Sequence, residues 1–167
     1  KYFNSSLISC DKYIHKLKLI EDNKEKLGIT NIQVKEQDAT LTNDLFTDKF
    51  DIVVCDVPCS GIGVIKNKPE IKYKITNAYV EDIAKLQYEI LENSKHYVKQ
   101  GGTLLYSTCT IDKRENIQNI EKFLKENRHF ILEKITLNNS IVKTRDNGVL
   151  EILPDEYSCD GFFIAKL

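Results

Sequence analysis

Two cysteines and an aspartate are the residues of this chain that could do chemistry together. Asp56 and Cys59 follow the apolar run 52–55, in the segment Asp-Val-Pro-Cys-Ser-Gly-Ile-Gly that begins at Asp56. Cys109 follows a second apolar run, 103–107, and has a threonine on either side. A thiolate is a strong nucleophile toward an activated ring carbon or an acyl group, and a helix that begins just after Cys109 would lower the pKa of its thiol. Taken alone, the first segment fits an ordinary Pro/Gly turn equally well.

Three acidic residues stand at or just beyond the ends of predicted strands: Asp11, Asp38 and Asp56. If those strands are parallel, the acids meet at the sheet edge where open α/β sheets bind their ligands. Such a set suits a nucleoside. Asp11 could hold ribose hydroxyls, Asp38 could accept from an adenine amino group, and Asp56 could reach the reacting end. Each acid taken singly also fits a helix cap or a turn.

Strand and helix patterns alternate along the chain. The apolar runs predict strands at 7–11, 31–34, 52–55, 103–107, 130–135 and after Gly161, and the helical spacing predicts helices at 13–27, 79–98 and 115–127. We expect Gly28 and Gly101-Gly102 to end the first two helices, one helical turn around Leu45 and Phe46, and loops after Gly63 and at 138–150. The alternation predicts an α/β fold with a mostly parallel sheet and helices on both faces.

Composition excludes several classes of protein. The 167 residues are 41% hydrophobic and 29% charged with a net charge of −1, which predicts one globular domain without an overall basic character. No run of 18 apolar residues occurs, and residues 1–6 lack the apolar core of a signal peptide. The five cysteines form no Cys-x-x-Cys pair, so free thiols in a reducing compartment fit better than disulfides or a zinc site. We expect Cys10 and Cys55 to be small buried hydrophobes, and we assign no role to Cys159.

Four segments together resemble the RNA cytosine-5 methyltransferases of the Sun/Nop2 type, which depend on S-adenosylmethionine. They are Asp56–Val64 (DVPCSGIGV), Pro69–Lys72 (PEIK), Tyr106–Thr110 (YSTCT) with Glu115-Asn116, and Asp160–Phe163 (DGFF). The resemblance runs in order from about residue 7 to the end of the chain. Two separate cysteine motifs in this order are a far more specific signal than a lone Gly-rich loop.

The resemblance implies a Rossmann-like methyltransferase fold and a covalent mechanism. Cys109 corresponds to the cysteine that attacks C6 of the target cytosine, which lets C5 take the methyl group. Cys59 corresponds to the cysteine that helps release the methylated base, and Asp56 to the carboxylate at the cytosine edge. By position, Asp11 matches the ribose-binding acid and Asp38 the acid near the adenine. Asp56 and Pro58 complete the set implied to bind the cofactor.

RNA is the partner that the resemblance implies, with ribosomal RNA as the first expectation and transfer RNA as the second. Lys66, Lys68 and Lys72, with Lys74 close by, are candidate contacts to RNA phosphates, although such a lysine group is also common in solvated loops. We expect no metal and no membrane partner, and the sequence does not indicate an oligomeric state. The expected location is cytoplasmic, or nucleolar if the source is eukaryotic.

The chain departs from the family pattern at its start. Members have a Gly-rich loop with a lysine after the first strand of the sheet, and that loop and strand do not precede residue 7 here. Tyr13 stands where many members have a polar residue. We therefore expect residues 1–167 to be a single catalytic-domain fragment of a longer protein, one that binds S-adenosylmethionine weakly or not at all by itself.

Two other hypotheses stay open from the sequence. The first is a methyltransferase that acts on DNA, protein or a small molecule. DNA cytosine-5 enzymes use the cysteine of a Pro-Cys motif, here Cys59, and the Thr-Cys motif around Cys109 argues against that hypothesis. The second is a non-catalytic module that binds RNA or protein, which the intact set of Asp56, Cys59 and Cys109 disfavours.

Overall fold

The computed structural model describes residues 5–137 and 148–167, and the chain forms two compact units, residues 1–42 and residues 43–167. Each unit is described by itself. The predictions made for residues 1–4 and 138–147 lie outside the described residues. Within the described part of the chain, no helix combines the length and the apolar composition needed to cross a membrane.

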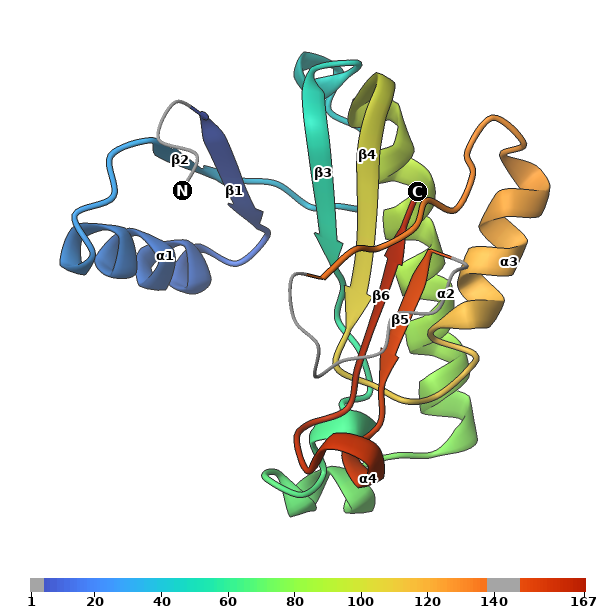
Figure 1. The fold of residues 1–167 in the computed structure, drawn as a ribbon. Coiled ribbons are helices and arrows are strands. Elements are labelled where there is room, and N and C mark those ends of the chain that lie inside the picture. Colours follow the sequence, from blue (N-terminus) through green and yellow to red (C-terminus); the bar gives the residue numbers. More distant parts are fainter. Residues whose placement is uncertain (1–4, 138–147) are drawn as a thin grey trace. The chain divides into compact units, whose positions relative to one another are not determined.

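The first unit is a strand–helix–strand segment, drawn in blue in Figure 1, with the elements β1 (Leu7–Asp11), α1 (Ile14–Lys26) and β2 (Ile32–Glu36). β1 and β2 are parallel, with Asp11 opposite Glu36 at their carboxyl ends. The helix ends before Gly28, whose φ of +63° is the left-handed conformation that glycine adopts without a steric cost. Both strands and the helix therefore confirm the elements that the sequence predicts here.

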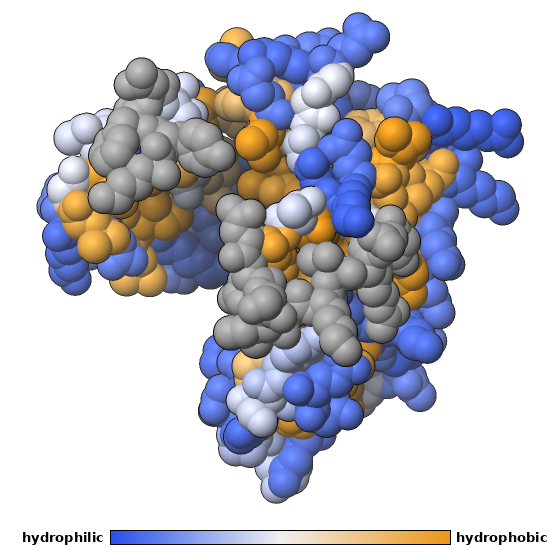
Figure 2. Space-filling view, in the orientation of Figure 1, coloured by the Kyte–Doolittle hydropathy of each residue, from blue (hydrophilic) through white to orange (hydrophobic). Residues whose placement is uncertain are grey.

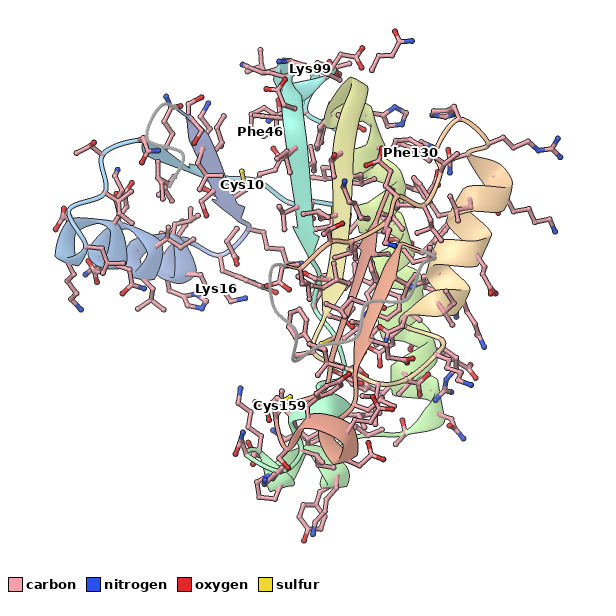
Figure 3. All side chains as sticks on the ribbon, in the orientation of Figure 1. Cys10, Lys16, Phe46, Lys99, Phe130 and Cys159 are labelled. Carbon is pink, nitrogen blue, oxygen red and sulfur yellow. The ribbon has the colours of Figure 1, made fainter. Side chains whose placement is uncertain are left out.

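Cys10 does not behave as the small buried hydrophobe that the sequence predicts. It lies on β1 with an exposed side chain (Figure 3). The reason is the size of the unit, because two short strands and one helix have too little apolar area to enclose a side chain completely. In keeping with this, α1 has no buried residue.

The second unit holds a four-stranded sheet with helices packed against it. Its elements in chain order are β3 (Phe50–Asp56), α2 (Asn77–Ser94), β4 (Val98–Thr108), α3 (Ile117–Glu126), β5 (Val149–Ile152), α4 (Pro154–Tyr157) and β6 (Phe162–Lys166). The strand order is β3-β4-β6-β5. β3 and β4 are parallel, whereas β6 is antiparallel to both β4 and β5 (Figure 1).

The core of this unit lies between the sheet and the pair α2 and α3. α2 contacts β3, β4 and α3. The largest side chains with under 2% exposure come from all these layers: Leu104 and Tyr106 of β4, Leu91 of α2, Ile120 and Phe123 of α3, and Phe163 of β6. Each such side chain contributes roughly 1.5–3 kcal/mol when it leaves water completely. The two strands that precede the candidate cysteines are thus attached to the best-packed part of the chain.

β3 is only half buried, although the sequence predicts a buried strand. Cys55 is 5% exposed, whereas Ile52 and Val54 are 61% and 62% exposed. Side chains alternate between the two faces of a strand, and the face that carries Cys55 is the one that α2 covers. Apolar surface is correspondingly visible over the strands of this unit in Figure 2.

Short 3-10 helices lie at Asp44–Phe46, Ile62–Val64 and Pro69–Tyr73, in segments predicted as turns or loops, and at Lys95–Tyr97, within the predicted helix 79–98. The first of them confirms the helical turn predicted around Leu45 and Phe46. Phe46, labelled in Figure 3, packs edge-on against Phe50 and Tyr97, with ring centroids 5.3 and 5.6 Å away. This small aromatic cluster fixes the start of β3.

Three boundaries differ from the sequence predictions. α2 ends at Ser94, and Gly101 and Gly102 lie inside β4, where the pairing with β3 shifts register, rather than at a helix end. Residues 130–135 form no strand; Glu133 N–H donates to Lys166 O at 2.9 Å, which does not extend into a ladder. The last residues of the predicted loop 138–150 belong to β5, which pairs with β6. Pairing with β6 decided the last two boundaries, and the local pattern of each segment does not contain that partner.

Candidate active site

Two parallel strands bring the two cysteine segments side by side. At their carboxyl ends Asp56 of β3 lies opposite Ser107 of β4, and Val57 N–H donates to Ser107 O at 3.2 Å. The chain leaves both strands in the same direction, so Cys59 and Cys109 follow at similar heights. Their Sγ atoms are 3.1 Å apart, close enough for one thiol to donate a hydrogen bond to the other.

Two glycines let the turn after Cys59 dock on the turn after β4 and on the start of β6. Gly63 N–H donates to Cys109 O at 3.1 Å, and Gly161 N–H donates to Gly63 O at 2.8 Å. A Cβ atom on Gly63 would lie 2.5 Å from Gly161 O and 2.8 Å from Cys109 O, which no side chain tolerates. The segment 160–163 therefore belongs to the site because its backbone closes over the Gly63 turn.

A buried carboxylate ties the Cys59 segment to the Cys109 segment. Glu115 is fully buried, and its Oε2 accepts from Ser60 N–H at 2.8 Å and from Gln87 Nε2 at 2.9 Å. Its Oε1 accepts from Ser60 Oγ at 2.5 Å and from Thr110 Oγ1 at 3.1 Å. Gln87 Nε2 also donates to Pro58 O at 2.8 Å. The residues on both sides of Cys59, and the residue after Cys109, thus bond to one cluster.

Asn116 holds the backbone around Cys109 from the other side. Its Oδ1 accepts from Thr108 Oγ1 at 2.6 Å, and its Nδ2 donates to Thr110 O at 2.9 Å. Both threonines are fully buried, whereas Cys109 is only partly buried. The side chains next to Cys109 are therefore fixed, while its thiol keeps access to the surface.

The surroundings of Cys59 make its thiol hard to ionise. Burial is the main cause that raises the pKa of Cys59 to about 12, and the hydrogen bond with Cys109 and the charge of that residue add to it. A second charge next to a first is disfavoured at this distance. Cys59 is therefore a thiol that keeps its proton while it contacts Cys109 Sγ.

Asp56 lies beside the thiol pair at the end of β3. It is exposed and accepts a hydrogen bond from Ser107 Oγ at 3.0 Å. Ser107 is two residues before Cys109, so this bond connects the carboxylate with the other cysteine segment. The structure thus brings three of the sequence-predicted residues together: Asp56, Cys59 and Cys109.

Asp11 and Asp38 belong to the first unit, at the carboxyl ends of β1 and β2. Asp11 Oδ1 accepts from Tyr13 N–H at 2.9 Å, and its Oδ2 lies 3.5 Å from Lys16 Nζ. Asp38 Oδ1 accepts from the backbone and the hydroxyl of Thr40 at 3.0 and 2.7 Å, which lowers the pKa of this carboxyl. Each acid shapes the turn after its strand, and each is partly exposed.

The candidate RNA-binding lysines follow the Cys59 segment in the chain and precede α2. Lys66, Lys68 and Lys72 are exposed. Lys72 Nζ lies 4.8 Å from the ring centroid of Tyr73, and Tyr73 is 80% exposed. A cation next to an unburied aromatic ring is an arrangement that single-stranded nucleic acids can use.

Residues 3–167 match the protein family described as 16S rRNA methyltransferase RsmB/F. The chain belongs to this family. Among RsmB/F relatives, the chain is 40% identical over 167 residues to the probable ribosomal RNA small subunit methyltransferase B of Bacillus subtilis (strain 168), covering 97% of this chain and 37% of the relative. It is 31% identical over 156 residues to the ribosomal RNA small subunit methyltransferase F of an Escherichia coli strain (O6:H1), covering 91% of this chain and 32% of that relative. The chain thus spans about a third of the length of these relatives.

Solved structures agree with the predicted fold of this RsmB/F chain. The structure described as NSun6 from Pyrococcus horikoshii with SFG is 28% identical to this chain and superposes on it with a TM-score of 0.83. The match covers 98% of this chain and 41% of the NSun6 chain. A methyltransferase homolog from the same organism is 25% identical and gives a TM-score of 0.78. The match covers 98% of this chain and 53% of the homolog's chain. The prediction of an α/β, Rossmann-like methyltransferase fold is confirmed.

The sequence prediction missed most of the polar cluster around Glu115 in this RsmB/F chain. Gln87 occupies a position of α2 that faces the core, four residues before Leu91, and a polar residue at such a position is a signal for a buried bond. Ser60 and Thr110 carried no comparable signal. Their role depends on the pairing of β3 with β4, which local sequence does not specify.

Proposed function

We propose that this chain is the catalytic part of an enzyme that methylates C5 of cytosine in RNA, with ribosomal RNA as the substrate, through a covalent bond between Cys109 and C6 of the base. The observation that carries the proposal is the pair of thiols at 3.1 Å, one partly exposed and one held as a thiol by a pKa of about 12. A mechanism with a bond-forming and a bond-breaking cysteine needs two groups of this kind in contact. Membership in the RsmB/F family supports the reaction class.

Cys109 is the nucleophile in this proposal. Its thiolate adds to C6, the C5–C6 double bond opens, and C5 becomes electron-rich enough to accept a methyl group. After C5 is methylated, a base takes the C5 proton, the electron pair of the C5–H bond re-forms the C5–C6 double bond, and the C6–S bond breaks to release the Cys109 thiolate. Cys59 assists this second half, because a thiol in contact with Cys109 Sγ can donate a hydrogen bond to the departing thiolate.

Asp56 contacts the cytosine edge and stabilises the charge that addition places on the ring. The carboxylate is exposed, and its bond with Ser107 Oγ engages Oδ1, which leaves acceptor capacity able to meet a base. The same bond orients Asp56 toward the Cys109 segment. The acid and the nucleophile therefore act on one base.

S-adenosylmethionine is the cofactor, and its sulfonium supplies the methyl group. In the first unit, Asp11 and Asp38 have the right chemistry for it, since carboxylates at the ends of parallel strands accept from ribose hydroxyls and from an adenine amino group. In the second unit, Asp56 and Pro58 are the other residues proposed to bind the cofactor. The Pro58 carbonyl already accepts from Gln87, so Pro58 contributes its ring and backbone shape rather than a free acceptor.

Lys66, Lys68 and Lys72 bind RNA phosphates in this proposal, next to the segment that carries Cys59. Ribosomal RNA is favoured over transfer RNA because the bacterial relatives are ribosomal RNA methyltransferases by name. Residues 1–167 act as one catalytic domain in a longer protein that works in the cytoplasm.

The test compares two cysteine variants of a full-length protein that contains this chain. Methyl transfer from tritiated S-adenosylmethionine to 16S ribosomal RNA and to transfer RNA is measured together with the RNA–protein adduct that survives denaturing electrophoresis. We expect Cys109→Ala to lose both signals. Cys59→Ala loses turnover but accumulates the adduct, because formation of the first bond does not need this thiol.

Cys159→Ala is the matched control, because Cys159 is exposed near α4 (Figure 3). We expect this variant to keep both signals. Bisulfite sequencing of the product identifies C5 methylation and its position. An adduct that requires Cys59 and not Cys109 would overturn the assignment of the nucleophile. RNA binding without methyl transfer by the unaltered protein would favour a non-catalytic module instead.

A further inference from the structure

We infer that Glu115 is the positioning residue that keeps the Cys59 segment against Cys109, an inference that rests on the proposed two-cysteine function. Glu115 does not contact either thiol. It acts through Ser60, whose backbone N–H and hydroxyl both donate to its carboxylate at 2.8 and 2.5 Å. Cys59 precedes Ser60 directly, so the position of its Sγ follows from where Glu115 holds the peptide.

The cluster is built across three separate parts of the fold. Ser60 comes from the turn after β3, Gln87 from α2, and Thr110 from the turn after β4. Gln87 Nε2 bridges Pro58 O and Glu115 Oε2 at 2.8 and 2.9 Å, while Thr110 Oγ1 reaches Oε1 at 3.1 Å. One side chain therefore fixes the distance between the two cysteine segments, because it bonds to a neighbour of each thiol.

The electrostatics fit a preorganised site. Burial of a carboxylate is costly unless hydrogen bonds replace its hydration, and here four donors surround its two oxygens. Tyr106 OH also donates to the backbone oxygen of Glu115 at 2.5 Å, which fixes the main chain as well. If the carboxylate were removed, the Ser60 N–H and the Gln87 amide would lose a buried acceptor, and the turn would move to find another.

Because the two oxygens of Glu115 have different partners, we expect Glu115→Ala and Glu115→Gln to have different effects on the Cys59 turn. Glu115→Ala removes all four bonds. Glu115→Gln keeps an acceptor at the Oε2 position for Ser60 N–H and Gln87, and its NH₂ group meets only hydroxyls, which can turn and accept. The glutamine variant should therefore hold the turn, while the alanine variant releases it.

The experiment measures the distance between the thiols without any use of methyl transfer. Dibromobimane bridges two nearby thiols and becomes fluorescent, and peptide mass spectrometry assigns the bridge to Cys59 and Cys109. We expect Glu115→Ala to slow bridging by about tenfold or more, since buried donors then lack their acceptor. Glu115→Gln stays within about threefold of the unaltered chain, because its remaining acceptor satisfies the fixed donors.

Glu121→Ala is the matched control, because Glu121 is an exposed glutamate on α3. Alkylation of Cys55, which is buried, reports whether each variant is folded. In a folded Glu115→Ala variant, Cys55 stays protected and single alkylation of Cys109 by N-ethylmaleimide persists, while bridging is slowed. A general loss of structure would expose Cys55 as well.

If Glu115→Ala does not fold, Ser60→Ala decides the question. This variant removes only the hydroxyl bonds to Glu115 and Thr110 and keeps the Ser60 N–H bond. We expect bridging to slow by about threefold, the size of a modest net hydrogen-bond loss. Unchanged bridging in every folded variant overturns the inference about Glu115 while leaving the roles of the cysteines intact. Slow bridging with a normal adduct and normal turnover supports the positioning and contradicts the proposed function.

Discussion

Cys59 and Cys109, 50 residues apart in the chain, place their sulfur atoms 3.1 Å from each other. The contact follows from the parallel pairing of β3 and β4, which aligns Asp56 with Ser107. Gly63 and Gly161 close the surrounding turns. The relationship between the two thiols is the basis of the first two predictions below.

Mild oxidation should join this pair before any other pair of cysteines. When diamide accepts two electrons and two protons from the thiols, we expect a disulfide between Cys59 and Cys109, because the sulfur atoms need little displacement to bond. Peptide mapping without reduction identifies the bridge. Cys10, Cys55 and Cys159 should stay as free thiols, and Cys59→Ser should prevent the bridge. A disulfide that instead joins Cys10 or Cys159 would contradict the geometry.

The thiol of Cys59 should become more reactive when Cys109 is replaced. Burial raises the pKa of Cys59 most, and the hydrogen bond and charge of Cys109 raise it further. Cys109→Ala removes the second and third causes, so the pKa falls and the thiolate fraction at pH 8.5 rises by about tenfold for each unit of decrease. Iodoacetamide alkylation followed by mass spectrometry measures this rate. Cys159 in the same samples provides the internal standard, and an unchanged Cys59 rate would show that burial alone controls it.

Replacing Asp56 should weaken the reaction with RNA without loosening the fold. Asp56→Asn keeps the shape and an acceptor for Ser107 Oγ but removes the charge proposed to act on the cytosine edge. We expect adduct formation to slow by about 100-fold, the usual cost of losing one electrostatic contact to a reacting group. Asp51→Asn at the start of β3 is the control, since Asp51 pairs with Lys99 at the surface. Equal effects of both substitutions would count against a role for Asp56.

Alkaline pH should destabilise the second unit through Cys55. Burial raises the pKa of this thiol from 9.0 to about 11. Above pH 9 the unfolded chain releases a proton that the folded chain keeps, so the free energy of unfolding falls as pH rises from about 9 to 11. At pH 10 the contribution of Cys55 is a loss of about 1 kcal/mol.

Urea unfolding at pH 7 and pH 10 measures this effect in the unaltered chain and in Cys55→Ala. The variant loses packing at both pH values, but the difference between the two pH values should shrink by the amount assigned to Cys55. Cys159→Ala, which changes an exposed thiol, should leave the difference as it is. An unaltered difference in Cys55→Ala would mean that other groups carry the alkaline loss.

The lysines before α2 should contribute to RNA affinity in a salt-dependent way. Lys68→Gln with Lys72→Gln should weaken binding to RNA of any sequence. The slope of log affinity against log salt should fall by about 0.7 for each phosphate on a single strand that the variant no longer neutralises. Fluorescence anisotropy with labelled RNA at several salt concentrations gives both values. Lys18→Gln with Lys26→Gln on α1 is the matched pair of exposed lysines. Identical slopes for the two double variants would exclude the proposed RNA contacts.

Local patterns were sufficient for the elements that carry the candidate residues. The apolar runs before Asp11, Asp56 and Cys109 are strands, and the spacing that ends at Gly28 is a helix. The strand predicted at 130–135 is wrong, and β5 was missed, because pairing with β6 decides strand formation there. Side-chain burial was the weaker prediction, since Cys10, Ile52 and Val54 are exposed where the faces of their strands lack cover.

The sequence by itself determined which residues could do chemistry and in which order they occur: an acid and a thiol after one strand, and a second thiol after a later one. It also carried the motifs that place the chain in its family. Only the tertiary structure decided that Cys59 and Cys109 touch, because that contact depends on the parallel pairing of β3 with β4. The burial of Glu115 among Ser60, Gln87 and Thr110 was likewise decided by packing, since Ser60 and Gln87 lie 55 and 28 residues away in the chain and no local pattern links them to Glu115.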